Sequence, residues 1–184
     1  PVKANGYGHG AVEIARLGER TGLVDWLGVS NVPEGLELRE AGLALPVLKL
    51  SPAFPEEMEA AVGNRVTLTV CEQSNIQALE DTCRRLGTTA PVHLKVDTGM
   101  GRIGVTPEEA PAMAAMIERE CPHLQLQWLF THLPVSDDVQ GVVSTQDQIH
   151  RFRGVSEAVN QAVGRPVPVH CCNSGAVLGH SEGW

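Results

Sequence analysis

The chain has 184 residues, of which 42% are hydrophobic and 20% charged, as in a globular domain large enough to bury a core. Its formal net charge of −8 at pH 7 argues against a nucleic-acid or anionic-membrane partner. The sequence has neither a run of about 18 apolar residues nor a secretory signal layout, so we expect no membrane span and a cytoplasmic protein.

Short apolar runs alternate with helical stretches along the chain. We expect strands at Trp26–Ser30, Pro46–Leu50, Val66–Val70, Val92–Val96, Leu124–Phe130 and Val167–His170. We expect helices at Gly10–Thr21, Pro33–Gly42, Pro55–Val62, Glu72–Leu86, from Thr106 to about Glu120, at Ser144–Val163 and from Ser174. Thr106 is a candidate N-cap, and Ser144 with Asp147 is a candidate capping pair.

This alternation predicts an α/β fold with a parallel sheet and right-handed crossovers. With Val2 as the end of a first strand, the chain holds about seven βα units, the last one cut short. Seven units approach a (β/α)8 TIM barrel, which has about 250 residues. An open doubly wound sheet is the alternative.

The five cysteines favour free thiols in a reducing compartment. Their number is odd, no Cys-x-x-Cys spacing occurs, and the adjacent Cys171 and Cys172 are expected in the core. A zinc site combining this pair with His132 and His170 is not favoured, because adjacent thiols converge poorly on one ion. We therefore predict no metal site.

Lys3 is the first candidate for chemistry. It follows a short apolar run and precedes a glycine-rich loop and a helix, so its amine should lie at the C-terminal mouth of a strand. The following helix can hold an anion at its N-terminus. Such an arrangement suits covalent attachment of an aldehyde cofactor that carries a phosphate, whereas a solvated loop lysine is the plain alternative. The glycine spacing at Gly6, Gly8 and Gly10 does not match either nucleotide-binding fingerprint.

Four blocks resemble signatures of the alanine racemases, which use pyridoxal 5′-phosphate. They read Val-Lys-Ala-Asn-Gly-Tyr-Gly-His-Gly at 2–10, His-Leu-Lys-Val-Asp-Thr-Gly-Met-Gly-Arg-Ile-Gly at 93–104, Phe-Thr-His at 130–132 and Asn-Ser-Gly-Ala at 173–176, in the family's order. The resemblance implies that residues 1–184 form the cofactor-binding barrel domain. It also implies that the start of strand one, strand eight and the C-terminal β-domain are absent from this sequence.

The resemblance assigns roles to the first two blocks. Lys3 would bind the cofactor covalently and act as an acid and base at the substrate Cα, and the Tyr7 hydroxyl would bind the phosphate. Arg102 would be catalytic and would bind the substrate carboxylate or the cofactor's phenolic oxygen. Lys95, on the same side of its strand as Asp97, would be carbamylated, since a bare ammonium is costly inside a barrel. The carbamate would orient Arg102.

The last two blocks complete the implied site. His132 would lie near the cofactor ring and take part in catalysis, and Asn173 and Ser174 would bind the phosphate at a helix N-terminus. His170 is a candidate supporting residue. The segment that begins with Leu133-Pro134 departs from the family's usual small-residue run, which leaves the preferred amino acid open.

The implied function is racemisation of L- and D-alanine by proton abstraction at Cα, which supplies D-alanine for peptidoglycan. The family is expected to act as a homodimer. Its second base and an arginine at the pyridine nitrogen match nothing in 1–184, so we expect this chain alone to be inactive. The alternatives are a serine or broad-specificity racemase, a non-catalytic module that binds pyridoxal phosphate, and a domain without a cofactor.

Overall fold

Six parallel strands form one curled sheet in this computed structural model, which describes residues 1–184. The strands are β1 (Leu27–Val29), β2 (Val47–Pro52), β3 (Val66–Val70), β4 (Ala90–Lys95), β5 (Leu124–Phe130) and β6 (Val169–His170). Each strand pairs with the next one along the chain, in the order β1-β2-β3-β4-β5-β6. A doubly wound sheet would reverse its order at a switch point, so that alternative is wrong.

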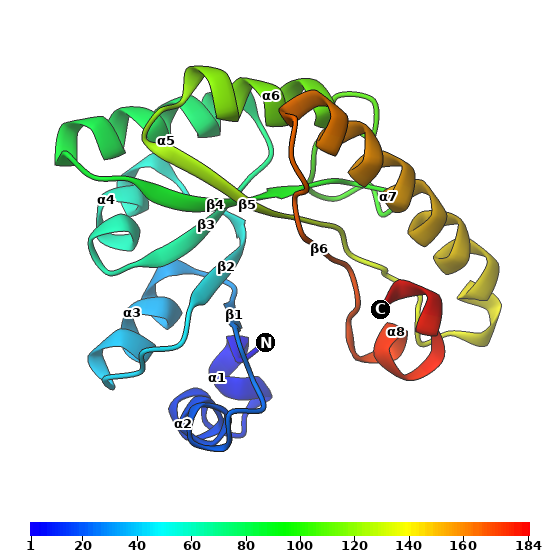
Figure 1. The fold of residues 1–184 in the computed structure, drawn as a ribbon. Helices are drawn as coiled ribbons and strands as arrows, with labels where there is room; N and C mark the ends of the chain where they lie inside the picture. Colours follow the sequence, from blue (N-terminus) through cyan, green and yellow to red (C-terminus); the bar gives the residue numbers. More distant parts are fainter.

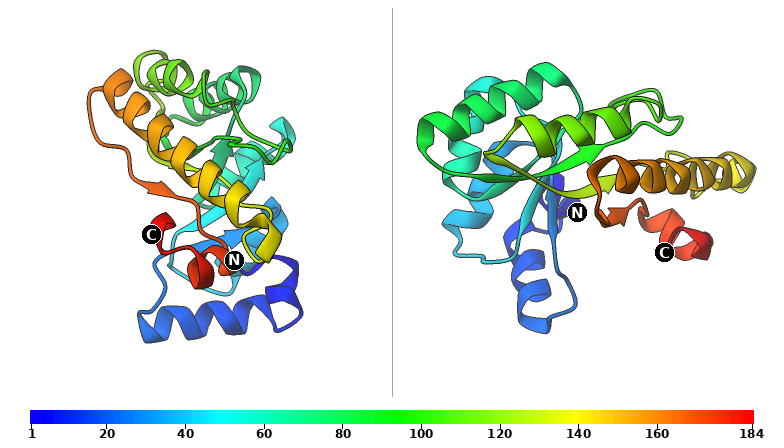
Figure 2. Two further views of the ribbon diagram at one scale, coloured as in Figure 1. Left: turned by 90° about the vertical axis from the view of Figure 1, so that its right-hand side faces the viewer. Right: turned by 45° about the horizontal axis from the view of Figure 1, so that its top comes forward.

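Helices α3 to α7 follow the convex side of the sheet, while α2 and α8 lie on either side of the opening (Figure 1). The helices are α1 (Lys3–Tyr7), α2 (Ala11–Thr21), α3 (Val32–Glu40), α4 (Pro55–Gly63), α5 (Gln73–Leu86), α6 (Ala110–Glu120), α7 (Val142–Val163) and α8 (Ser174–Gly179), with short 3-10 turns η1 (Val139–Gly141) and η2 (Ser181–Gly183). Figure 2 shows the same curvature from two further sides. The result is half of a barrel wall. None of its helices combines the length and apolar character needed to cross a bilayer.

The expected first strand is not formed, so the sheet has six strands where we expected seven. The Val2 N–H donates to the Gly28 carbonyl oxygen at 2.8 Å, which holds the chain beside β1. The chain then turns left-handed through α1, with φ of 50°, 53° and 62° at Ala4, Asn5 and Gly6. The Asn5 side chain accepts from the Ala11 N–H at 2.9 Å. The turn therefore leads straight into α2.

Two helix starts differ from expectation in opposite ways. The long helix α7 begins at Val142, and its N-cap residue Gly141 offers no side-chain cap, so the predicted capping pair Ser144 and Asp147 is wrong. Before α6, Thr106 and Glu109 cap each other: the Glu109 N–H donates to Thr106 Oγ1 at 3.3 Å, and Glu109 Oε2 accepts from the Thr106 hydroxyl at 2.8 Å. The expected start at Thr106 is thus a turn that precedes the regular helix.

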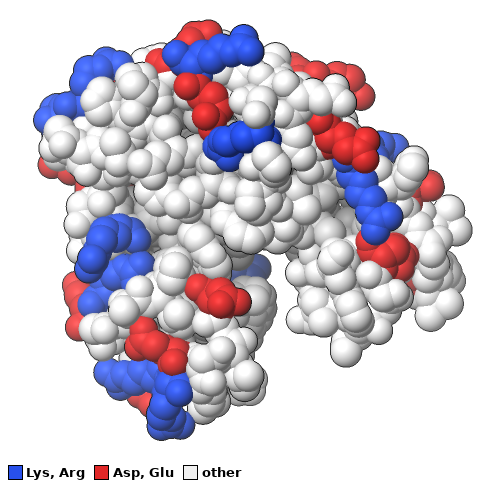
Figure 3. Space-filling view, viewed as in Figure 1, with Lys and Arg blue, Asp and Glu red and all other residues white.

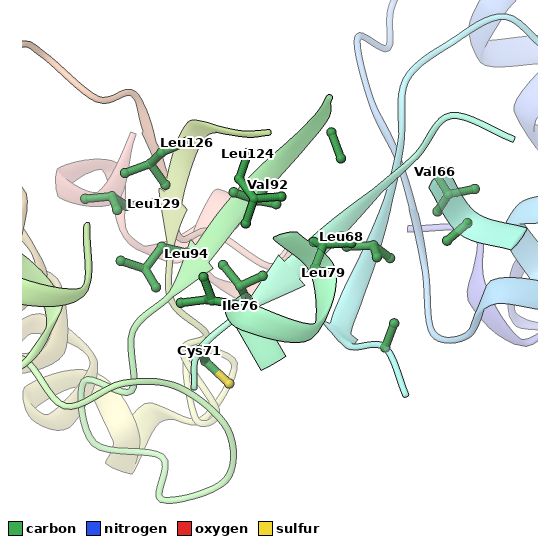
Figure 4. Close-up of a cluster of buried hydrophobic side chains, with 14 of the residues drawn as sticks. Val66, Leu68, Cys71, Ile76, Leu79, Val92, Leu94, Leu124, Leu126 and Leu129 are labelled. Carbon is green, nitrogen blue, oxygen red and sulfur yellow. The ribbon is translucent and has the colours of Figure 1, made fainter. Parts of the chain in front are cut away.

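The core lies between the convex face of the sheet and its helices. Leu68, Val92 and Leu94 from β3 and β4 pack with Ile76 and Leu79 of α5, and all five are almost fully buried (Figure 4). Burying a side chain of this kind contributes roughly 1.5–3 kcal/mol. Side chains alternate along a strand. Because Val92 and Leu94 point into this core, His93 and Lys95 point to the concave face.

Charged side chains of both signs are mixed over the face shown in Figure 3. The same view shows a deep notch between the N-terminal elements and the C-terminal segment. This notch leads toward the concave face of the sheet.

Candidate active site

A pocket of about 760 Å³ opens on the concave side, at the carboxyl ends of the strands. Its walls come from the N-terminal turn and from residues at or after the ends of β1, β2, β4, β5 and β6. The polar, aromatic and sulfur-containing lining residues are Lys3, Tyr7, Ser30, Ser51, Lys95, Arg102, Phe130, Thr131, His132, His170, Cys171, Cys172, Asn173 and Ser174. All seven residues predicted as site residues lie in this one pocket.

The pocket is cationic within an acidic chain. Lys3, Lys95 and Arg102 line it, and no aspartate or glutamate does. The chain as a whole carries a formal net charge of −8. Three cations without a lining carboxylate favour an anionic ligand, because clefts lined by one sign of charge concentrate the opposite sign.

Lys3 and Tyr7 reach the pocket from the two ends of α1. The Lys3 Nζ lies 5.6 Å from the centroid of the Tyr7 ring. The Tyr7 residue is 60% exposed, and its hydroxyl is free to donate to a ligand. The left-handed turn thus places an amine and a phenol together, although the sequence predicts only a loop there.

Lys95 is buried on the concave face at the end of β4. In the sheet register Lys95 pairs with Phe130, and Phe130 pairs with His170, so these three side chains share one face. The Lys95 Nζ lies 5.1 Å from the Phe130 ring centroid, while only 3% of the residue is exposed. Burial, and then the charge of Arg102, lower the pKa of the Lys95 amine. The Lys95 amine is therefore easier to deprotonate than that of a solvated lysine.

The loop from Asp97 to Gly104 carries Arg102 over the pocket. Asp97 closes it by accepting from the N–H groups of Gly99 at 2.9 Å and Arg102 at 2.8 Å. Burial alone would raise the pKa of the Asp97 carboxyl, but backbone N–H groups of the loop outweigh it and lower the pKa. The Asp97 carboxylate therefore binds the backbone of its own loop, and it forms no salt bridge with Lys95.

His132 lies two residues beyond β5, in the middle of the cations. Burial lowers the pKa of its imidazole, and the charges of Arg102, Lys95 and Lys3 lower it further. The imidazole is therefore harder to protonate than that of a solvated histidine. The preceding Thr131 is held by a buried hydrogen bond of 2.8 Å between its hydroxyl and that of Thr98. The histidine and the Arg102 loop are thereby linked.

Asn173 and Ser174 begin α8 at the far wall. The Asn173 Oδ1 accepts from the Ala176 N–H at 3.0 Å and from the Ser136 hydroxyl, while its amide nitrogen donates to the Leu133 carbonyl at 2.8 Å. One amide N–H remains for a ligand. The exposed Ser174 side chain faces the same pocket.

Cys171 and Cys172 were expected in the core, but that prediction is wrong. Both are half-buried and line the pocket, and all five cysteines are free thiols. No group of three or more His, Cys, Asp and Glu side chains is arranged to hold a metal ion.

A histidine pair on the concave face was not predicted as a unit. The His170 ring stacks on Phe130, with centroids 4.8 Å apart, and its Nε2 lies 3.2 Å from His93 Nδ1. His170 therefore lines the pocket itself and also supports Phe130 and His93 on the concave face. Alternation along β4 could have revealed His93, because it lies two residues before Lys95 and faces the same way.

Comparison with known proteins matches the chain along almost its whole length. Residues 1–183 match the family model described as alanine racemase, N-terminal domain. The alanine racemase of Cutibacterium acnes is 45% identical over 183 residues, and that of Symbiobacterium thermophilum is 40% identical over 181 residues. These matches cover 99% and 98% of this chain but 48% and 47% of the relatives. The chain thus spans about half the length of the curated relatives it matches.

Solved structures agree with the sequence comparison. An alanine racemase from Clostridium difficile superposes with a TM-score of 0.91 at 33% identity, over 98% of this chain and 49% of that one. The alanine racemase from Bacillus anthracis with bound L-Ala-P gives a TM-score of 0.88 at 30% identity, over 98% of this chain and 46% of that one. The prediction from the four sequence blocks is confirmed: the chain belongs to the alanine racemase family and corresponds to its N-terminal domain.

Proposed function

We propose that this chain is the pyridoxal 5′-phosphate-binding part of an enzyme that interconverts L- and D-alanine. The observation that carries the proposal is the pocket of about 760 Å³ that gathers Lys3, Tyr7, Lys95, Arg102, His132, Asn173 and Ser174. Family membership supports alanine as the substrate. Pro134, which raised doubt about the substrate, is not among the pocket-lining residues.

The residues present fit the cofactor. Its phosphate and phenolic oxygen are anionic, and the pocket offers cations without a competing carboxylate. The Tyr7 and Ser174 hydroxyls and the free Asn173 amide N–H would bind the phosphate, and the Lys3 amine would hold the aldehyde carbon. When bound, the cofactor supplies an electron sink for the pair left behind when a Cα proton departs.

Proton movement falls to Lys3 in this proposal. Its amine removes a proton from the substrate Cα on one face and returns one there in the opposite direction. Arg102 orients the substrate carboxylate from above, since a guanidinium fork matches a carboxylate. His132, whose pKa is lowered by burial and by the nearby cations, would lie near the cofactor ring.

We further propose that Lys95 is carbamylated. The lowered pKa of Lys95 makes the neutral amine, which is the form that reacts with carbon dioxide, easier to reach than in a solvated lysine. The resulting anion would pair with Arg102. The full-length protein equilibrated with ¹³C-bicarbonate should show a carbamate carbon resonance by NMR. That resonance should be missing from a Lys95→Gln variant, and its absence from the unsubstituted protein would count against the modification.

The oligomeric state, the cellular location and the biological role of the full-length enzyme belong to the same proposal. We infer that the full-length enzyme acts as a homodimer in the cytoplasm and supplies D-alanine for peptidoglycan. The second base and the partner of the pyridine nitrogen would come from outside residues 1–184.

Borohydride trapping tests the proposed function in the full-length protein. With pyridoxal phosphate, an absorbance band and a single reduced adduct on the Lys3 peptide are expected, together with exchange of the alanine Cα proton in deuterated water. Lys3→Ala should abolish both. Adducts scattered over several lysines would refute the site. A Lys3 adduct without Cα exchange would indicate a non-catalytic cofactor module, and faster exchange of serine than alanine would indicate the broader racemase.

A further inference from the structure

Two adjacent thiols line the pocket and have no part in the proposed reaction. Cys171 and Cys172 directly follow β6, and their Sγ atoms lie 3.8 Å apart. Both thiols donate to the Gly183 carbonyl oxygen, at 3.4 Å and 3.2 Å. A shared acceptor means that the two sulfur atoms converge on one side of the chain. The other cysteines, Cys71, Cys83 and Cys121, are buried.

The geometry of this pair is poorly suited to a disulfide. Adjacent residues have Cα atoms about 3.8 Å apart across a trans peptide, whereas disulfides usually need about 4.4–6.8 Å. The sulfur atoms would also have to approach to about 2.05 Å. A single larger atom placed between the two sulfur atoms requires a much smaller change. The pair is therefore better suited to chelation than to oxidation.

We propose that Cys171 and Cys172 form a dithiol site that chelates a trivalent arsenical carrying one organic group. Arsenic(III) is a soft centre, and soft centres select sulfur ligands. Two As–S bonds form and two As–OH bonds break. Each thiol proton leaves with one hydroxyl, giving two water molecules, and arsenic stays trivalent, so the step requires no oxidant or reductant.

The electrostatics of the pair agree with this choice. Burial, and then the neighbouring Cys172, raise the pKa of the Cys171 thiol to about 12. A protonated thiol reacts slowly in alkylation and in oxidation by peroxide, both of which use the thiolate. Condensation with an As–OH group releases water and no net proton, so its equilibrium does not require prior ionisation of the thiols.

The bound group would share the pocket with the proposed cofactor. Cys172 directly precedes Asn173 and Ser174, and all of them line the same 760 Å³ space. An organic group on the arsenic would therefore fill part of the volume beside Ser174. Inhibition of alanine racemisation by the bound arsenical rests on the proposed function. The binding of the arsenical to the two thiols does not.

Intact mass spectrometry of the full-length protein with phenylarsine oxide, in excess glutathione, tests the site. We expect one phenylarsenic group per chain in place of two hydrogen atoms, removable by 2,3-dimercaptopropanol. Glutathione should not displace it, because the second thiol attacks at a high effective concentration. Cys171→Ala, Cys171→Ser and Cys172→Ala should each lose the adduct, while Cys121→Ala should keep it.

The outcomes separate the dithiol site from the proposed enzyme. An unsubstituted protein without adduct, or an adduct that persists in the single variants with unchanged melting temperatures, would overturn the chelate. Cys171→Ser keeps the side-chain size, so its loss of binding cannot be attributed to unfolding once its melting temperature is unchanged. An adduct confined to this pair upholds the site even if the untreated protein does not racemise alanine.

Discussion

At the scale of single residues, Gly104 has the least freedom to vary in the Arg102 loop. Its φ is 142°, and a Cβ there would lie 2.4 Å from the Asp97 nitrogen and 2.7 Å from the Val96 carbonyl carbon. Both obstacles are backbone atoms, so no side chain can move aside. The loop closes over the strand end only because this position has no side chain.

Gly104→Ala should therefore move Arg102 away from the pocket. We expect about a 100-fold loss of kcat/KM for alanine in the full-length protein, the cost of a displacement of about 1 Å at a reacting centre. Gly63→Ala is the matched control, since its Cβ would meet nothing within 4 Å at the end of α4. Steady-state kinetics on both variants decide the matter, and equal kcat/KM values would contradict the role of Gly104.

The pair of His93 and His170 should make stability depend on pH. Burial lowers the pKa of His93 to about 3, with a smaller effect from His170, and burial with the charge of Lys95 lowers that of His170 to about 4. Unfolded histidine titrates near 6.5, so the unfolded chain binds more protons below that pH. The stabilisation by neutral imidazoles is complete above about pH 6.5 and is lost as the pH falls toward 4.

His93→Asn tests this dependence, because asparagine can keep a hydrogen-bonding nitrogen near Nδ1 but does not titrate. The free energy of unfolding, measured with urea between pH 6 and 4, should fall less steeply by about 1 kcal/mol per pH unit. His9→Asn, at an exposed histidine, should keep the original slope. Identical slopes for all three proteins would contradict a neutral buried pair.

At the scale of elements, α7 supports the site from outside the pocket. The buried Gln148 accepts from the Thr98 hydroxyl at 3.3 Å, and Arg151 donates to the Thr98 carbonyl oxygen at 2.5 Å. Thr98 in turn bonds Thr131, which precedes His132. One helix thus fixes both the start of the Arg102 loop and the end of β5.

Gln148→Ala should lower the free energy of unfolding by about 1–3 kcal/mol, because it leaves a buried hydroxyl with one partner fewer. Gln161→Ala, on the exposed side of the same helix, should change it by less than about 0.5 kcal/mol. Urea denaturation midpoints of the two variants give the comparison. Equal effects would mean that the Thr98 network carries no stability.

At the scale of the whole molecule, the pocket at the carboxyl ends of the strands differs in charge from the rest of the surface. The helical exterior carries both signs of charge, whereas the pocket carries three cations and no carboxylate. Anionic groups should consequently stabilise the folded protein by binding at the pocket.

Pyridoxal 5′-phosphate should raise the melting temperature of the full-length protein more than pyridoxal does. At a concentration about 100-fold above its dissociation constant a ligand contributes about 2.7 kcal/mol. Replacing Tyr7 by Phe and Ser174 by Ala together should remove most of the difference between the two compounds. Differential scanning fluorimetry measures it, and equal shifts from both compounds in the unsubstituted protein would exclude phosphate recognition.

Most of the helices and strands could be predicted from the sequence, because the residue patterns that specify them are local. β-branched runs such as Val66–Val70 and caps such as Thr106 with Glu109 act over a few residues, so strands and helices could be located directly. The predictions of the first strand and of the start of α7 were wrong for the opposite reason. The left-handed turn at Ala4 and Asn5 is held by a contact with Ala11, and no local propensity predicts it.

The sequence by itself determined the seven candidate site residues, since four ordered blocks identify them and parallel strands bring their carboxyl ends to one edge. Only the tertiary structure decided the surroundings on which their chemistry depends. The lowered pKa of Lys95 requires burial against the Phe130 ring of a neighbouring strand. The position of Cys171 and Cys172 at the pocket follows from the open concave face. Burial, pKa shifts and shared acceptors arise from residues distant in the chain, so they exist only once the sheet has curled.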